Sequence, residues 1–211
     1  MIGASFRCLV ASLTLLVSTS SSSFAEDNKW AVDYVTEENI HASVNGQVTH
    51  GDKLIVRFVK GYCDLGNLLT TVYTVADHPD IMTLKDKLLP VNFIGMNIKV
   101  KVIYISPFLS GHRVMVDIGW VAPKDLKHDL GKQEPITLAF KDYNGTTINE
   151  YFDIPENAWS NNNLRAALDE AQDMCLSLRG FYDLRIREKQ KDSYHLTGSS
   201  YPVFISQGYW K

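Results

Sequence analysis

Apolar and polar residues alternate with a period of two over most of the chain between residues 30 and 154. Successive side chains of a β-strand point to opposite faces of a sheet, so this alternation predicts strands with one buried face. The clearest case is residues 98–104, where Val100 and Val102 alternate with Lys99 and Lys101. The other segments with this pattern are residues 30–34, 41–47, 54–59, 68–75, 114–118, 136–140 and 147–154.

Turn-forming residues between these segments indicate how the strands are joined. Asn144 and Gly145 separate residues 136–140 from residues 147–154. An Asn-Gly pair favours a tight hairpin, because both residues adopt a positive φ more readily than other residues do. We also expect a hairpin with a longer loop, at residues 106–111, between the clearest strand and the one that follows it.

The period changes after Pro155. From residue 164 onward, apolar residues recur with the spacing i, i+3, i+4 and i+7, which is the buried stripe of an amphipathic helix. The residues of this stripe are Leu164, Ala167, Leu168, Ala171, Met174, Cys175 and Leu178. Residues 160–163 offer polar caps for the first turn, and Gly180 can end the helix in a left-handed conformation. The pattern therefore predicts a helix over residues 161–179.

Together these segments predict an α+β fold. It consists of a mainly antiparallel, sandwich-like sheet of about seven or eight strands, covered by one amphipathic C-terminal helix. The structural alternative is an outer-membrane β-barrel, whose strands also alternate, but a helix with a cysteine on its buried stripe argues against it. Residues 26–180 account for the patterned region as one domain, and residues 181–211 form an extension that we expect to dock on it.

The first 25 residues have the three parts of a secretory signal peptide. Arg7 supplies the positive charge, residues 8–17 form a short apolar segment, and residues 23–25 form a small-residue cleavage site, so that the mature chain begins at Glu26. About ten apolar residues are too few to cross a hydrocarbon core of ~30 Å. We therefore expect a periplasmic or secreted protein.

Cleavage would remove Arg7 and change the formal net charge from −3 to −4. This mild acidity argues against nucleic acid as a partner, because nucleic-acid-binding proteins carry clustered Lys and Arg.

Two cysteines remain in the mature chain, Cys63 and Cys175. Thiols pair in oxidising compartments, so we predict a disulfide between them. The alternative is two buried free thiols, which pack like small hydrophobic residues.

Motifs that carry chemistry are weak in this sequence. The histidines lack the spacing of a metal site, and the sequence holds neither a phosphate-binding glycine loop nor a nucleophile elbow. The nearest approaches to a ligand cluster are His78 with Asp80, and Asp125 with His128 and Asp129. We predict no metal, no cofactor and no catalytic residue. The alternative is a hydrolase whose loop Asp and His residues, His78 and His112 among them, converge only in the folded protein.

The C-terminal region holds two candidate contact surfaces. Aromatic residues near a terminus must dock on the domain or bind a partner; they are Tyr201, Phe204, Tyr209 and Trp210. A basic run could make a weak contact with a membrane surface, although acidic neighbours dilute it; its cations are Arg185, Arg187, Lys189 and Lys191. Asn144 also begins an N-x-[ST] sequence, which is a glycan acceptor only in a eukaryotic secretory pathway.

These features favour an exported binding or interaction protein without catalytic activity, whose partner is another envelope or secreted protein. The hypothesis depends on the leader, on the disulfide-linked β fold and on the weakness of every catalytic motif. No transmembrane segment remains after cleavage of the leader. Two alternatives stay open: the secreted hydrolase described above, and a structural subunit of the envelope that assembles with itself.

Overall fold

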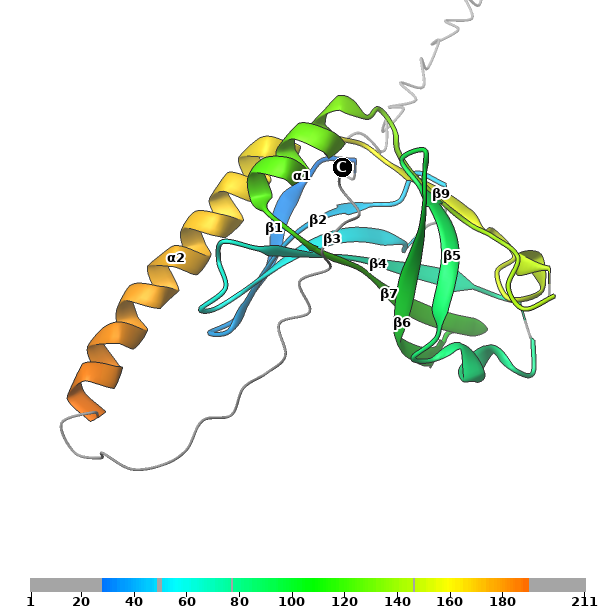
Figure 1. Ribbon diagram of the computed structural model, residues 1–211, viewed down its shortest axis with the longest axis horizontal. Helices are drawn as coiled ribbons and strands as arrows, with labels where there is room; N and C mark the ends of the chain where they lie inside the picture. Colours follow the sequence, from blue (N-terminus) through cyan, green and yellow to red (C-terminus); the bar gives the residue numbers. More distant parts are fainter. Residues whose placement is uncertain (1–27, 49–50, 77, 146, 190–211) are drawn as a thin grey trace, which may run out of the picture.

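The computed structural model describes residues 28–48, 51–76, 78–145 and 147–189, with the side chains of the C-terminal helix as far as Leu178. The strands form one sheet that curls into a half-barrel (Figure 1), in the order β1-β2-β3-β4-β7-β6-β5-β8-β9. The strands are β1 Ala31–Val35, β2 Asn39–Asn45, β3 Lys53–Val59, β4 Gly66–Thr74, β5 Leu88–Phe93, β6 Met96–Phe108, β7 Gly111–Val121, β8 Ile136–Phe140 and β9 Glu156–Trp159. The helices are η1 Ile81–Leu84, α1 Pro123–Asp129, η2 Leu130–Lys132, η3 Ile148–Glu150 and α2 Leu164–Lys189.

One face of the curled sheet surrounds a continuous apolar core. Val102 of β6 lies opposite Val116 of β7, and both side chains are fully buried in that core. Lys99 and Lys101, which alternate with the buried valines, lie on the exposed face. The alternation that predicts a strand at residues 98–104 is therefore confirmed in both its period and the face that it buries.

The mainly antiparallel α+β class is confirmed, but the strands do not form a sandwich. All nine strands that the structure describes belong to a single sheet. Because twist accumulates from strand to strand, a sheet of this width can curl until its own inner face encloses the core, and no second sheet is needed. The sequence pattern did not predict β5, where Pro90 interrupts the apolar run, or the short strand β9.

The turn at Asn144 and Gly145 forms, but the expected hairpin partner is wrong. The φ angles of these two residues are 50° and 80°, as a tight turn requires. The next strand is β9, which pairs with β8, rather than residues 147–154. That segment instead forms η3 and buries Phe152, whose ring stacks on Phe140 at 4.5 Å. Adjacent apolar side chains at Tyr151 and Phe152 are both buried here, which an alternating strand cannot achieve.

The hairpin between β6 and β7 is confirmed, with a shorter loop than expected. Pairing continues through Ser106 and Phe108, so that only Leu109 and Ser110 connect the two strands. Pro107 lies within the pairing region. Proline is tolerated in a strand where its missing N–H faces no neighbour, and the pairing of β6 with β5 ends at Lys101.

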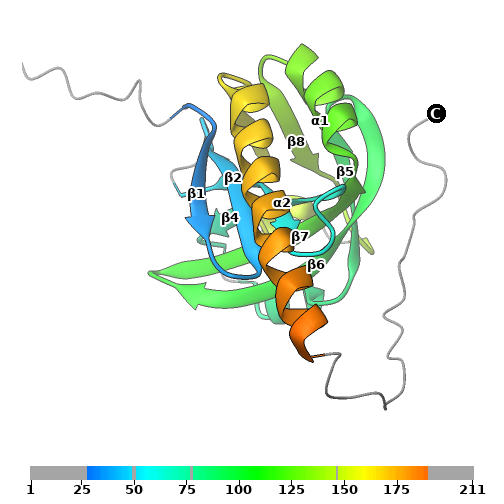
Figure 2. The same cartoon turned by 90° about the vertical axis from the view of Figure 1, so that its left-hand side faces the viewer.

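Helix α2 lies against β1, β2 and β3, across the side where the curl is open (Figure 2). The predicted disulfide is confirmed: it joins Cys175 of α2 to Cys63, after β3, with the Cα atoms 5.7 Å apart. Gln172 also donates a hydrogen bond to the Cys63 carbonyl, at 3.1 Å. The helix begins at Leu164 and continues past Gly180, because a glycine within a helix costs only about 1 kcal/mol. In the described part of the chain, no helix has an apolar stretch sufficient to cross a bilayer.

The two ends of the curled sheet are hydrogen-bonded to each other. The last strand, β9, and the residues after it bond to the segments next to β1 and β2. The backbone N–H of Gln47 donates to the carbonyl of Ala158 in β9, at 2.7 Å. Just before β1, the N–H of Trp30 donates to the carbonyl of Asn162, and its indole N–H donates to the carbonyl of Ser160. Trp30 is fully buried. These contacts place β9 beside the turn that connects β2 to β3.

Replacing both cysteines by serine should destabilise the protein markedly. The disulfide spans a sequence separation of 112 residues, and the loop-entropy model gives about 4 to 5 kcal/mol for a loop of that size. We expect denaturant unfolding of Cys63→Ser/Cys175→Ser to show a free energy of unfolding lower by about 3 to 5 kcal/mol. Wild-type protein measured in a reductant should match the double variant, and equal stability of the oxidised and reduced wild-type protein would contradict the assignment.

Candidate functional site

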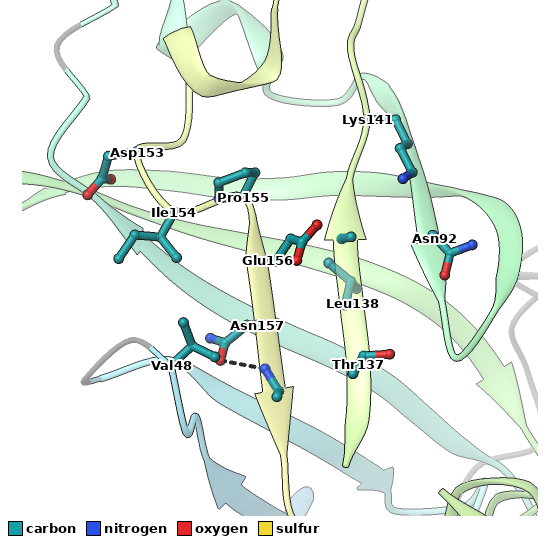
Figure 3. Close-up of a pocket in the computed structure, with 12 residues that line it drawn as sticks. Val48, Asn92, Thr137, Leu138, Lys141, Asp153, Ile154, Pro155, Glu156 and Asn157 are labelled. Atoms are coloured by element: carbon teal, nitrogen blue, oxygen red, sulfur yellow. Dashed lines mark hydrogen bonds between the residues drawn. The ribbon is translucent and has the colours of Figure 1, made fainter. Parts of the chain in front are cut away.

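A shallow, open groove of about 660 Å³ lies on the outer face of the sheet over β5, β8 and β9 (Figure 3). Binding sites for ligands usually have volumes of roughly 300 to 1,000 Å³ and combine apolar walls with a few polar groups. The groove has this size and this mixture of side chains. Its open shape is better suited to a ligand that lies along the surface than to one that is enclosed.

Small side chains form the floor of the groove. The register of the sheet aligns Asn92 of β5, Ala139 of β8 and Glu156 of β9 across one face. Next to this row, Thr137 of β8 lies opposite Ala158 of β9. The short side chains of the floor leave room above the backbone, while Asn92 and Glu156 supply polar groups at its margins. The pairing of three strands fixes these positions.

The two sides of the groove differ in chemistry. Val48, Ile154 and Pro155 line one side, and Lys141 lies on the other side near Asn92 (Figure 3). Val48 and Ile154 are 54% and 40% exposed, which is unusual for branched apolar side chains that lie next to each other on a surface. The groove therefore offers apolar contacts along one side and a cation and an amide along the other.

The apolar side is held in place by Asp153. Its carboxylate accepts hydrogen bonds from the Thr74 hydroxyl, at 2.7 Å, and from the backbone N–H of Val75, at 3.0 Å. Thr74 is fully buried at the end of β4. The loop that precedes β9 is thus attached to a central strand of the sheet, and the position of Ile154 does not depend on the loop alone.

Below the groove, a buried carboxylate connects three parts of the sheet. Asp52, in the turn between β2 and β3, is only 2% exposed. Its carboxylate accepts the backbone N–H of Tyr73 in β4 at 2.7 Å and the side-chain amide of Asn157 in β9 at 2.5 Å. A side chain at Gly46 would lie 2.9 Å from this amide, so glycine is required there for the contact to form.

The environment of Asp52 makes it titrate near neutrality. Burial raises the pKa of the Asp52 carboxyl from 3.8 to about 7. The hydrogen bonds from Tyr73 and Asn157 oppose the increase in pKa, and the negative charge of Asp153 adds to it. Both carboxylate oxygens accept hydrogen bonds from within the fold. Asp52 therefore stabilises the strands around the groove and does not present its carboxylate to a ligand.

The free edge of β9 is partly covered. The carbonyl of Ala158 accepts the N–H of Gln47, and the N–H of Ala158 donates to the side-chain oxygen of Asn157 at 2.8 Å, the dashed line in Figure 3. An edge strand binds another strand through its outward N–H and C=O groups. Because both groups of Ala158 already have partners, this part of the edge does not present them to a ligand.

The histidines considered as catalytic residues lie in two different settings. His78 packs on the ring of Tyr151 at 4.3 Å and lies 3.7 Å from a carboxylate oxygen of Glu150. His112 lies on β7, opposite Pro107, and within the described residues its buried Nδ1 has no hydrogen-bond partner. Neither histidine lines the groove.

The predicted absence of a metal cluster stays a prediction. His128 contacts Asp129 and Lys132 on the exposed side of α1 and η2. Asp125 lies in the first turn of α1, where an acidic residue interacts favourably with the helix dipole. Within the ranges that the structure describes, no three His, Cys, Asp or Glu side chains are grouped in a way that could hold a metal ion.

Most of the predicted contact residues lie beyond the described region. Tyr201, Phe204, Tyr209, Trp210 and Lys191 are outside the described residues, as are residues 1–25, the expected leader. Arg185, Arg187 and Lys189 lie on the last turns of α2, where only the backbone is described. Among the residues named from the sequence, the structure joins Cys63 to Cys175 in a disulfide and places His128 beside Asp129, its neighbour in the chain.

Sequence reasoning missed the groove and the buried Asp52. In the sequence, Asp52 follows Gly51, a setting that is typical of a turn residue and gives no sign of burial. Asn157 gave one usable signal, because it takes an inward position in a short alternating segment that ends in the buried Trp159. An amide on the inner face of a strand needs a polar partner, but the sequence could not indicate that this partner lies in the turn between β2 and β3.

Comparison of the chain with protein-family models, with curated proteins and with solved structures finds no match.

The stability of the protein should depend on the protonation of Asp52. A folded-state pKa of about 7 against an unfolded value of 3.8 means that the contribution of Asp52 to stability is complete below pH 3.8 and is lost as the pH rises through 7. Between pH 5 and pH 8 this amounts to about 2 to 3 kcal/mol. We expect denaturant unfolding of the wild type to show this decrease, and Asp52→Asn to lack it.

Two comparisons separate this effect from other titrations. Burial lowers the pKa of His41, which gives a pH dependence of the opposite sign, but that effect is common to wild type and variant. Asp173→Asn removes an exposed carboxylate on α2 and should keep the wild-type pH profile. Identical profiles for the wild type and Asp52→Asn would show that Asp52 does not titrate in this range.

Proposed function

We propose that the protein is an exported, non-enzymatic binding protein of the cell envelope or extracellular space, and that it holds an extended segment of a partner protein in the groove over β8 and β9. The observation that carries the proposal is the groove itself. It combines an apolar side, formed by Val48 and Ile154, with the polar groups of Lys141, Asn92 and Glu156 at its margins, over a floor of short side chains on paired strands.

The chemistry of the groove favours a polypeptide partner. Apolar side chains can pack against Val48 and Ile154, while backbone amides can bond to Thr137 on the floor and to Asn92 and Glu156 at the margins. Because Ala158 at the edge of β9 already has backbone and side-chain partners, recognition would depend on side chains rather than on addition of a strand. An open groove also allows the partner chain to continue beyond both ends of the site.

Export is the second part of the proposal. The disulfide between Cys63 and Cys175 is typical of an oxidising compartment. The sequence of residues 1–25 is typical of a secretory leader. Both features favour the periplasm or the extracellular space, where a protein without catalytic groups acts by binding another envelope or secreted protein.

A bulky side chain on the floor should abolish peptide binding. We would select binders from a random peptide library on the immobilised full-length protein and measure their affinity by calorimetry. Ala139→Tyr fills the floor without entering the core and should weaken the selected peptides at least about tenfold, which corresponds to about 1.4 kcal/mol. Val35→Tyr, at an exposed position on β1, is the matched control and should bind as the wild type does. Equal affinity for Ala139→Tyr and the wild type would refute the proposed site.

The protein made with its complete sequence in a secreting host should be recovered without residues 1–25. Intact-mass spectrometry should give the mass of a chain that begins at Glu26, with two hydrogens fewer than the reduced form because of the disulfide. A mass that includes Met1, together with two thiols that react with an alkylating agent, would contradict both the export and the compartment that we propose.

A further inference from the structure

The half of the β6–β7 hairpin that is nearer the turn carries a cation, Arg113, and no acidic residue. Residues 87–116 contain Lys87, Lys99, Lys101 and Arg113 but no Asp or Glu, although the whole chain has a formal net charge of −3. The acidic residues that flank this region are Asp86 and Asp117. Lys101 forms an ion pair with Asp86, at 3.2 Å, and lies opposite Asp117 of β7, so Arg113 is the cation of this region that lies next to the turn of the hairpin.

The end of this hairpin is also apolar and exposed. Leu109, at its tip, is 86% exposed, the highest value among the large apolar residues that the structure describes as exposed. Phe108 beside it is 37% exposed, and Tyr104 on the same strand is 49% exposed. A soluble protein rarely gathers such side chains at one projecting point without a contact for them.

The hairpin projects beyond its neighbours (Figure 2). The pairing of β5 with β6 ends at Lys101, so within the described residues β6 pairs only with β7 from Tyr104 to Phe108. On the other side, the last pair between β4 and β7 is Thr74 with His112. β4 therefore flanks the hairpin almost to its end, and the tip that extends beyond the last pairs of both neighbouring strands is short, with Leu109 and Ser110 at its turn.

The tip is rigid although it projects. The ring of Phe108 meets the edge of the Tyr73 ring at 5.7 Å, and the guanidinium of Arg113 lies 3.8 Å from the centre of the Phe108 ring. The Tyr73 hydroxyl is 3.3 Å from the Ser110 hydroxyl. At Gly111 a Cβ atom would lie 2.0 Å from the carbonyl oxygen of Thr74, so the base of the tip packs directly on β4.

Leu109 is an unfavourable choice for the turn that it occupies. Its φ is 52°, in the left-handed region that glycine and asparagine adopt at low energetic cost and in which a large side chain is strained. Leucine at this position makes the fold less stable than asparagine would. A strained and exposed apolar residue is consistent with selection for a contact rather than for stability.

We propose that the tip of the β6–β7 hairpin binds the surface of an anionic membrane. Leu109 and Phe108 enter the layer between headgroups and acyl chains, and Arg113, which lies against the Phe108 ring, contacts lipid phosphates. Aromatic and cationic side chains together favour this interface. A narrow convex tip can enter a headgroup layer, whereas a protein partner would need a matching pocket. The inference is independent of the peptide groove, because it depends on different strands and side chains.

Flotation of the full-length protein with vesicles tests the proposal. We expect binding to vesicles of phosphatidylglycerol and phosphatidylcholine, weaker binding to phosphatidylcholine alone, and loss of binding as salt screens the charges. Leu109→Asn should bind anionic vesicles about tenfold more weakly, since it removes most of the inserted apolar surface. Its midpoint of thermal unfolding should equal or exceed that of the wild type, because asparagine relieves the strain at φ 52°.

The matched control is Leu88→Asn, which removes a leucine of 53% exposure from β5, at the far end of the hairpin from the tip. It should bind vesicles as the wild type does. Arg113→Gln should reduce the preference for anionic over zwitterionic vesicles. The proposal is overturned if the wild type does not float with anionic vesicles, if Leu109→Asn binds as well as the wild type, or if Leu88→Asn is equally impaired.

Discussion

The hydrogen bonds between β9 and the turn after β2 hold the two ends of the curled sheet together, and the other features of the structure depend on them. A half-barrel leaves two edge strands and an open seam, and unpaired backbone groups at a seam are costly if they are buried. Here Asp52 and Asn157 join across the seam, the backbone of Gln47 bonds to β9, and Trp30 fills the adjoining space. The floor of the groove is the outer face of the strands that this contact fixes. Burying a carboxylate for this purpose is unfavourable at high pH, because two hydrogen bonds only partly replace its hydration.

Much of the fold could be predicted from the sequence because period-two alternation reports directly which face of a strand is buried. Residues 98–104 are the clearest example, and the disulfide was predicted from the two cysteines that would remain after cleavage of the expected leader. The single curled sheet could not be predicted, because alternation indicates that a face is buried but not what covers it. The prediction of a strand after Asn144 and Gly145 was wrong for a related reason. Tyr151 and Phe152 are adjacent apolar residues that both enter the core, and only the three-dimensional position of Phe140 explains why they do so.

The candidate site was less predictable than the fold, and the reason is its composition. Its floor consists of Thr137, Ala139 and Ala158, which are ordinary outward-facing residues in sequence and become a trough only when β8 pairs with β9. Asp52 and Asn157 are far apart in the sequence, and each taken alone reads as a turn or strand residue. A catalytic motif would have been visible because chemistry requires particular residue types, whereas a binding surface requires shape, which arises from long-range pairing.

The groove and the hairpin tip are different kinds of surface, and the difference follows from how the sheet is built. The groove lies where three paired strands make a rigid floor, and its side chains are mixed in charge. The tip lies where β6 extends past β5, so it can be apolar and basic without disturbing the core. Leu109 is exposed in the turn and does not reach the interior, and Ala139 faces outward from β8. Changes at either surface can therefore be made separately, because no residue of β6 or β7 lines the groove.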